Sequence, residues 1–369
     1  MQVILFVGHH KVGSSALQNY LAQNALALIE RGILYPATES EGLTTLLTMA
    51  MAGKEMPLVP LPVNLTEAHN ALAFRMISDI TEKPIPALHQ GLPSTETMLT
   101  TVKRQIDIFQ PEVVILAAEV FANFAAVSPA LIDRLQQFFD GADITVTATL
   151  RRIDDYLVSW HGQRLRFGQA PRALPNGALN HYYRNIHFNY HKMLQSWIKH
   201  MPRAQIRLRS YDQVRAAGGS VQDLMTQAGL PMPSDPARAR RANESLHRGL
   251  IEIARQGNAA LEAGPAHQLF LSLLRLGPKL DLPPASEVEM YGAPARAQML
   301  ERFTPIHDWL CERTGNTFFP DLEDIARTRS QAEYEINRAA LSQIRSRHMG
   351  DVPAGARDFL AKLEIAPNH

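Results

Sequence analysis

The segment that most constrains the fold is residues 3–17, where an apolar run leads through a glycine-bounded loop into a helical pattern. Residues 3–7 are all apolar, Gly8 and Gly13 bound the loop, and two serines open the next segment. A buried strand that leads into a helix in this way presents the free N–H groups and positive dipole end of the first helical turn at one point. The segment therefore predicts a phosphate cradle on an α/β sheet.

The loop differs from a nucleoside-triphosphatase loop at one position. The triphosphatase pattern is G-x-x-x-x-G-K-[ST], with the lysine directly after the second glycine. Here the glycine spacing is kept, but Ser14 stands in the lysine position, Ser15 follows it, and Lys11 lies inside the loop. The loop predicts anion binding without the magnesium chemistry of a triphosphatase. Taken alone, it also fits a turn before a surface helix, with Lys11 solvated.

A second segment, residues 144–160, adds a separate pair of phosphate-binding groups. A β-branched run ends at Leu150 and Arg151, and a helical pattern follows that carries Ser159. Arginine offers a rigid fork of donors suited to phosphate oxygens, and serine adds a compact donor. Arg152 is the alternative ligand, but the spacing to Ser159 favours Arg151.

Together the two segments resemble the sulfotransferases that use 3′-phosphoadenosine 5′-phosphosulfate (PAPS). The loop is similar to their K-x-G-[ST]-[ST] motif, which holds the phosphosulfate end of the donor. Arg151 and Ser159 match their L-R-x-P-x-x-x-x-x-S-x-[YW] motif, which holds the 3′-phosphate. This chain departs from that motif at Ile153, which replaces the proline, and at Trp160, which precedes the expected aromatic position occupied by His161.

The resemblance implies an α/β fold, a P-loop-type three-layer α/β/α sandwich with a central parallel sheet. It implies transfer of the sulfuryl group from PAPS to a hydroxyl of a small molecule or glycan, without a metal. A glycan or glycolipid acceptor is favoured by the bacterial setting that the chain suggests. The residues that would hold the donor are His10, Lys11, Gly13, Ser14, Ser15, Arg151 and Ser159. The alternatives are a P-loop small-molecule kinase and a non-catalytic, sulfotransferase-like nucleotide-binding protein.

The catalytic residues are predicted to be Lys11, which would stabilise charge on the departing phosphate, and Glu119 as the base. Glu119 follows the apolar run 113–118, typical of a buried parallel strand, and strand ends carry the chemistry of open α/β sheets. His9 and His10 are rival bases because imidazole titrates near neutrality. A helix N-cap or an ion pair is the alternative role for Glu119.

Composition limits the remaining possibilities. The chain has 369 residues, 46% of them hydrophobic, a formal net charge of +1 and one cysteine, Cys311. This size suffices for one large core or two modest ones, and the charge argues against a broad nucleic-acid or anionic-membrane surface. The single cysteine fits a reducing compartment, and no run is long enough for a signal peptide or membrane span, so we expect a cytoplasmic protein. The histidine spacing fits no common metal motif.

The chain is predicted to divide into a nucleotide-binding core, residues 1–230, and a mostly helical portion, residues 231–369. The core contains a helical insertion at about 40–95, interpreted either as a mobile cover of the site or as packing segments rich in methionine. An R-x-N-x-S-L run within 238–246 is similar to one in bacterial sulfotransferase-like proteins. Strands are expected near 32–36, 111–119, 144–150 and 205–209, and helices near 16–31, 93–110, 128–139 and 188–201.

Overall fold

The computed structural model describes residues 1–53, 61–232 and 245–366. The chain forms two compact units, one of residues 1–151 with 190–242 and one of residues 152–189 with 243–369. Residues 152–189, predicted as part of the nucleotide-binding core, thus group with the C-terminal residues. One reason is that Asn258 donates its side-chain N–H to the carbonyls of Leu165 and Gln169, both at 2.8 Å.

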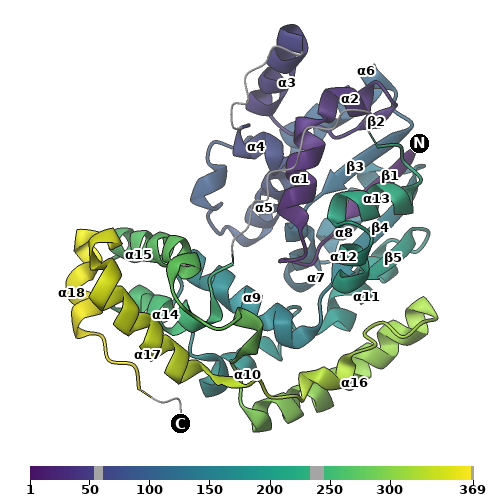
Figure 1. Ribbon diagram of the computed structural model, residues 1–369. Helices are drawn as coiled ribbons and strands as arrows, with labels where there is room; N and C mark the ends of the chain where they lie inside the picture. The colour runs from purple at the N-terminus through teal and green to yellow at the C-terminus, as the bar shows by residue number, and fades with distance from the viewer. Residues whose placement is uncertain (54–60, 233–244, 367–369) are drawn as a thin grey trace. The chain divides into compact units, whose positions relative to one another are not determined.

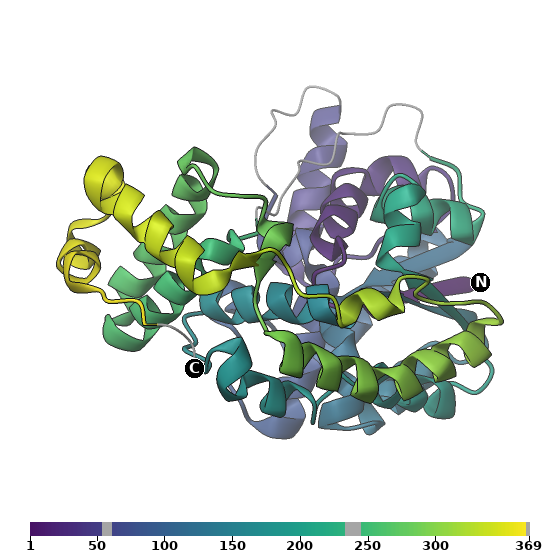
Figure 2. The same ribbon diagram turned by 60° about the horizontal axis from the view of Figure 1, so that its bottom comes forward.

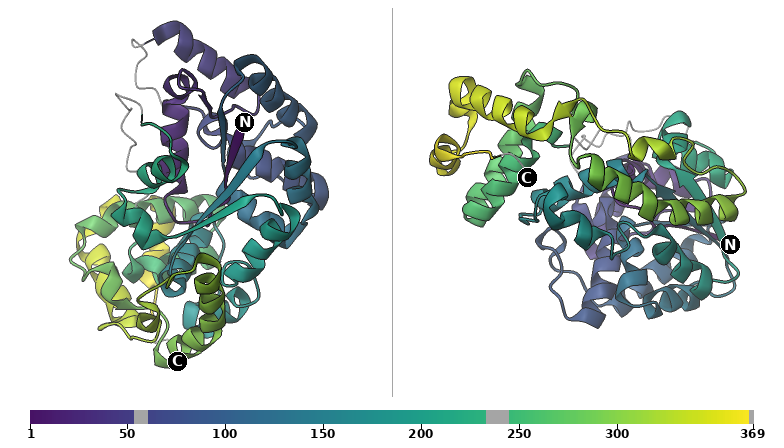
Figure 3. Two further views of the ribbon diagram at one scale, coloured as in Figure 1. Left: turned by 90° about the vertical axis from the view of Figure 1, so that its right-hand side faces the viewer. Right: turned by 90° about the horizontal axis from the view of Figure 1, so that it is seen from below.

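The first unit is built on a five-stranded parallel sheet with the strand order β2-β3-β1-β4-β5 (Figures 1 and 3). Phe6 of β1 lies opposite Ala117 of β3 on one side and Thr147 of β4 on the other. The carboxyl ends of these three strands therefore meet at one edge. The strands are β1 (Gln2–Phe6), β2 (Ile33–Leu34), β3 (Val113–Ala117), β4 (Asp143–Leu150) and β5 (Gln205–Ser210).

Both faces of the central strands are buried, which explains their uninterrupted apolar sequence. Ile4 and Ile115 belong to a cluster on one face that includes Leu17 and Leu21 of α1. Side chains alternate along a strand, so Val3 and Leu5 of β1 face the other side, where they are equally buried. The α/β class with a parallel sheet is confirmed. The helices of this unit are α1 (Ser14–Gln23), α2 (Ala25–Ile29), α3 (Ser40–Ala52), α4 (Val63–Thr66), α5 (Ala68–Thr81), α6 (Thr95–Phe109), α7 (Phe124–Val127), α8 (Ala130–Phe138), α11 (Tyr190–His200), α12 (Tyr211–Ala216) and α13 (Ser220–Ala228).

Among its described residues, the predicted insertion at 40–95 contains the helices α3, α4 and α5. Its third helix, α5, packs on β3, and two of its side chains bind the end of that strand. His69 Nδ1 accepts the N–H of Ala117, the last residue of the strand, at 3.1 Å, and Asn70 Oδ1 accepts the N–H of Val120, in the turn after it, at 3.4 Å. This part of the insertion therefore packs on the sheet. Residues 54–60, with the proline-rich start of the run, lie outside the described residues.

The second unit is mostly helical, as predicted for the C-terminal portion. Helices α17 and α18, in yellow, lie beside α14 and α15 (Figure 2). A short parallel pair joins β6 (Val288–Glu289) to β7 (Gln331–Ala332). Within the described ranges, no helix is both long and apolar enough to cross a membrane. The helices are α9 (Ile153–Arg166), α10 (Leu179–Tyr182), α14 (Ile251–Ala260), α15 (Ala263–Leu276), α16 (Ala293–Thr314), α17 (Glu333–Gln343) and α18 (Ala354–Lys362).

Candidate functional site

The loop between β1 and α1 depends on glycine at both ends. Gly8 has φ +104°, and a Cβ there would lie 3.3 Å from both the Cα and the carbonyl oxygen of Glu119. Gly13 has φ +90° and is the N-cap of α1, so no side chain at that position caps the first turn. The hydroxyl of Ser220 donates to the carbonyl of Gly13 at 2.9 Å. Glycine therefore allows the loop to approach the end of β3 and the start of α13 closely.

Backbone hydrogen bonds tie the start of the loop to the end of β4. The N–H of Val7 donates to Thr147 at 3.0 Å, that of Thr149 to Gly8 at 2.7 Å, and that of His9 to Thr149 at 2.8 Å. The β1–β4 ladder is thus prolonged beyond the strands as far as His9. As a result, the loop and the residues that follow β4 lie at the same edge of the sheet.

Three residues predicted separately for the site are in contact. Glu119 begins a short 3₁₀ turn (Glu119–Asn123) that follows β3. The hydroxyl of Ser14 donates to Glu119 Oε2. Its Oε1 lies 3.5 Å from His10 Nδ1, with the two side chains 20% and 11% exposed. The N-cap of the 3₁₀ turn is Ala118, so Glu119 is not the cap that the alternative interpretation allowed. The candidate bases Glu119 and His10 thus form a pair.

The surroundings of Arg151 include two residues that sequence analysis did not identify. The hydroxyl of Tyr190, at the start of α11, donates to the carbonyl of Arg151 at 2.8 Å. The guanidinium carbon of Arg151 lies 5.2 Å from the ring centroid of Tyr211, at the start of α12. The ring of Tyr190 also lies 5.5 Å from that of His9 in the loop. No local pattern in the sequence indicates these contacts.

The other predicted residues of the segment lie in the second unit. Ser159 is half-buried on α9, and Trp160 stacks on His187 with ring centroids 3.9 Å apart. Arg152, the alternative phosphate ligand, is buried and donates to the carboxylates of Asp154 and Asp321. The guanidinium of Arg152 is therefore engaged in an ion network of its own unit.

His161, at the expected aromatic position of the motif, has a structural environment in the second unit. It is buried and its Nδ1 lies 2.9 Å from the hydroxyl of Tyr182. Burial, together with the positive charges of Arg164 and Arg255, lowers the pKa of His161 to about 3. His161 is therefore a neutral core residue at physiological pH.

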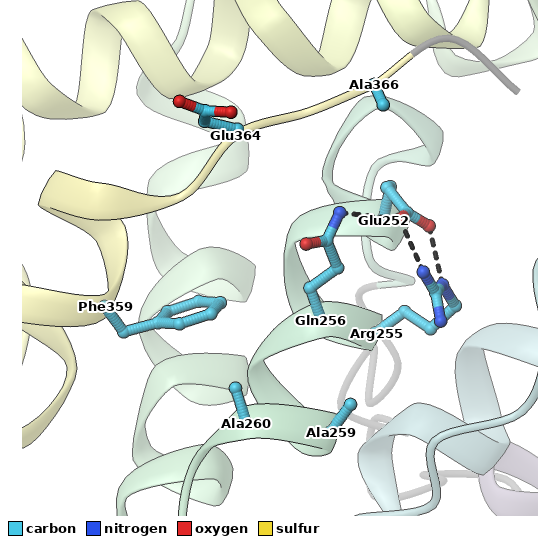
Figure 4. Close-up of a pocket in the computed structure, with 8 residues that line it drawn as sticks. All are labelled: Glu252, Arg255, Gln256, Ala259, Ala260, Phe359, Glu364 and Ala366. Carbon is cyan, nitrogen blue, oxygen red and sulfur yellow. Dashed lines mark hydrogen bonds and ion pairs between the residues drawn. The ribbon is translucent and has the colours of Figure 1, made fainter.

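Two cavities lie in the second unit, and none of the predicted site residues lines either of them. A cavity of about 510 Å³ is bordered by Glu252 and Arg255, which are joined by two hydrogen bonds (Figure 4). A second, of about 660 Å³, lies along α17 and the segment that follows α18. Among residues 1–53, 61–232 and 245–366, no group of three histidine, cysteine or acidic side chains is placed to bind a metal.

Comparison of the chain with family models, with curated proteins and with solved structures gave no match. The function is therefore argued from the chemistry of the first unit. There the loop of residues 7–13, here called the cradle loop, follows β1, Arg151 follows β4, and Glu119, the partner of His10 in the loop, follows β3. These groups lie at one edge of the parallel sheet, the edge at which such sheets bind ligands.

Proposed function

We propose that the protein is a cytoplasmic sulfotransferase with a P-loop-type three-layer sandwich, which transfers the sulfuryl group of PAPS to a hydroxyl of a small molecule or glycan. The observation that carries the proposal is the hydrogen-bonded link between the cradle loop and the end of β4, from Val7 to His9. It brings the loop, which would hold the 5′-phosphosulfate, and Arg151, which would hold the 3′-phosphate, to one sheet edge.

The donor would be held by groups of opposite charge to its phosphates. The N-terminal N–H groups of α1 and the side chain of Lys11 suit the phosphosulfate, and the half-buried Ser15 adds a hydroxyl at the first turn. Arg151 suits the 3′-phosphate, with Ser159 as the further ligand that the motif suggests. Because Ser14 replaces the lysine and its hydroxyl donates to Glu119, these residues favour a sulfotransferase over a kinase.

The paired Glu119 and His10 give the reaction its base. Glu119 would take the proton of the acceptor hydroxyl as the acceptor oxygen bonds to sulfur, and His10 would stabilise the carboxylate and relay the proton. The bond between sulfur and the bridging oxygen breaks, and its electron pair stays on the phosphate of 3′-phosphoadenosine 5′-phosphate (PAP). Lys11 and the loop N–H groups would stabilise the charge that develops there. The products are the sulfate ester, PAP and one proton.

Calorimetric binding of PAP and of ADP, without magnesium, tests the donor site. Wild type should prefer PAP, and Arg151→Ala should lose this preference by about 10–100-fold, since a charged hydrogen bond contributes roughly 1.5–3 kcal/mol. Lys11→Ala should weaken the binding of both PAP and ADP. The matched control is Arg203→Ala, which removes an exposed arginine of the same unit.

A turnover assay with labelled PAPS and a panel of hydroxyl acceptors tests the reaction. Glu119→Gln should abolish transfer while PAP still binds. Binding of ATP with magnesium, and not of PAP, would overturn the proposal in favour of a kinase. Binding of PAP without transfer to any glycan or small hydroxyl compound would indicate a non-catalytic nucleotide-binding protein.

A further inference from the structure

We propose that Tyr190 and Tyr211 are positioning residues that hold Arg151 in place and thereby set the preference of the site for a 3′-phosphorylated nucleotide. The inference rests on the proposed function, because it concerns the residue assigned to the 3′-phosphate. Tyr190 fixes the backbone of Arg151 and Tyr211 fixes its guanidinium. All three residues belong to the first unit.

Tyr190 replaces a strand partner for the backbone of Arg151. The parallel register of β4 with β5 ends at the pair Leu150 and Ser210, so Arg151 lies one residue beyond the ladder. A carbonyl at a partly buried position needs a hydrogen-bond donor. The hydroxyl of Tyr190, whose side chain is fully buried, supplies it at 2.8 Å. The chain direction at Arg151 is therefore fixed by a side chain 39 positions further along.

Tyr211 orients the guanidinium of Arg151. The distance of 5.2 Å between the guanidinium carbon and the ring centroid is within the range of a cation–π contact. Tyr211 is itself held in place, because it follows the N-cap residue Ser210. The side chain of Ser210 accepts the backbone N–H of Gln213, and the side chain of Gln213 accepts the backbone N–H of Ser210. The guanidinium is a rigid planar fork of N–H donors, so a contact that fixes its position also fixes the direction in which the fork could bind a phosphate.

Tyr190 also connects the two ends of the donor site. Its ring lies against that of His9, and His9 Nδ1 accepts the N–H of His10 at 2.7 Å, within the cradle loop. Tyr190→Phe keeps the ring and removes only the hydroxyl. This variant therefore separates the bond to Arg151 from the contact with the loop.

The first readout is the ratio of PAP affinity to ADP affinity, measured by calorimetry. Tyr190→Phe and Tyr211→Leu should each lower this ratio about threefold to tenfold with ADP affinity unchanged, since one neutral hydrogen bond or one cation–π contact is lost. Tyr211→Phe keeps an aromatic face and should restore the wild-type ratio. Tyr35→Phe is the matched control, because its buried hydroxyl likewise donates to a backbone carbonyl, that of Thr66 at 3.1 Å.

The second readout needs no nucleotide. The side-chain Nε–H signal of Arg151, assigned with Arg151→Lys, should show restricted motion in wild type by 15N relaxation. Tyr190→Phe and Tyr211→Leu should increase that motion, and Tyr211→Phe and Tyr35→Phe should not. Unchanged relaxation in both of the first variants would overturn the inference, as would a lower ratio in Tyr35→Phe. A wild type that does not prefer PAP but shows an ordered Arg151, released in these variants, would overturn the proposed function and leave the positioning itself supported.

Discussion

Acidification should destabilise the first unit because His69 is buried as a neutral imidazole. The side chain is fully inaccessible on α5, and the ring of Tyr35 lies edge-on to it with centroids 4.6 Å apart. Burial lowers the pKa of His69 to about 3, while the nearby carbonyl of Pro36 raises it by a smaller amount. A proton on Nδ1 would in addition displace the N–H of Ala117 from its acceptor.

The size of the loss in stability follows from the difference between the pKa of His69 in the folded protein and its pKa in the unfolded protein. An unfolded histidine has a pKa of about 6.5, above the folded value, so below pH 6.5 the unfolded state binds more protons and stability falls. At pH 5.0, which is 1.5 units below the unfolded pKa, the protonation of His69 in the unfolded state should lower the free energy of unfolding of the protein by about 2 kcal/mol. With a denaturant slope of roughly 2 kcal/mol per molar urea, the unfolding midpoint should fall by about 1 M.

The assay must follow the first unit alone, because His161 should act in the same direction in the second. Trp160→Phe with Trp309→Phe leaves Trp197 of α11, buried in the first unit, as the fluorescent reporter. Urea midpoints are then compared at pH 7.5 and 5.0. His69→Asn, whose side-chain oxygen can accept the N–H of Ala117, should lose most of the pH dependence, whereas the control His191→Asn should keep it. An unchanged fall of the midpoint in His69→Asn would refute the reasoning.

Two further changes test the second unit and the loop. Burial and the charge of Glu252 raise the pKa of Glu333 to about 8, above an unfolded value near 4.5, so the protein loses stability as the pH rises between these two values. Glu333→Gln should therefore raise the melting temperature at pH 8 but not at pH 4.5. An equal gain at both pH values would contradict this. Gly8→Ala should weaken PAP binding at least tenfold, because its Cβ meets the backbone of Glu119 at 3.3 Å; Gly141→Ala, also at positive φ but with no atom within 4 Å, should bind PAP as wild type does.

The sheet was predictable from the sequence because its signals are local. The continuous apolar runs at 3–7 and 113–118 are long enough, and bounded clearly enough, to indicate buried strands. Element ends were less well predicted. The helix expected at 16–31 is interrupted at Asn24, whose side-chain N–H donates to the carbonyl of Tyr20 and ends α1. Such a bond competes with the helical ladder, and periodicity alone does not reveal it.

The site was predictable only where it follows from sheet geometry. The meeting of Glu119 with the cradle loop is a consequence of parallel strands that end at one edge, once both strands are identified. The contacts of Tyr190 and Tyr211 with Arg151 depend instead on where α11 and α12 begin in space. The same holds for His69 of α5, because no pattern in the surrounding sequence indicates that its side chain is buried against β3. For the cradle loop, Arg151 and Ser159, the role in binding the donor stays a prediction.

The route of the chain, which leaves the first unit after β4 and returns at α11, has a consequence for its synthesis. Helix α9 emerges from the ribosome long before its partners, since Asp155 pairs with Arg248, 93 residues later. At about 5–20 residues per second, α9 waits roughly 5–20 s for that partner. During this interval the apolar side chains of α9 are accessible to chaperones and proteases, and the first unit completes its sheet with β5 before the C-terminal residues of the second unit are made.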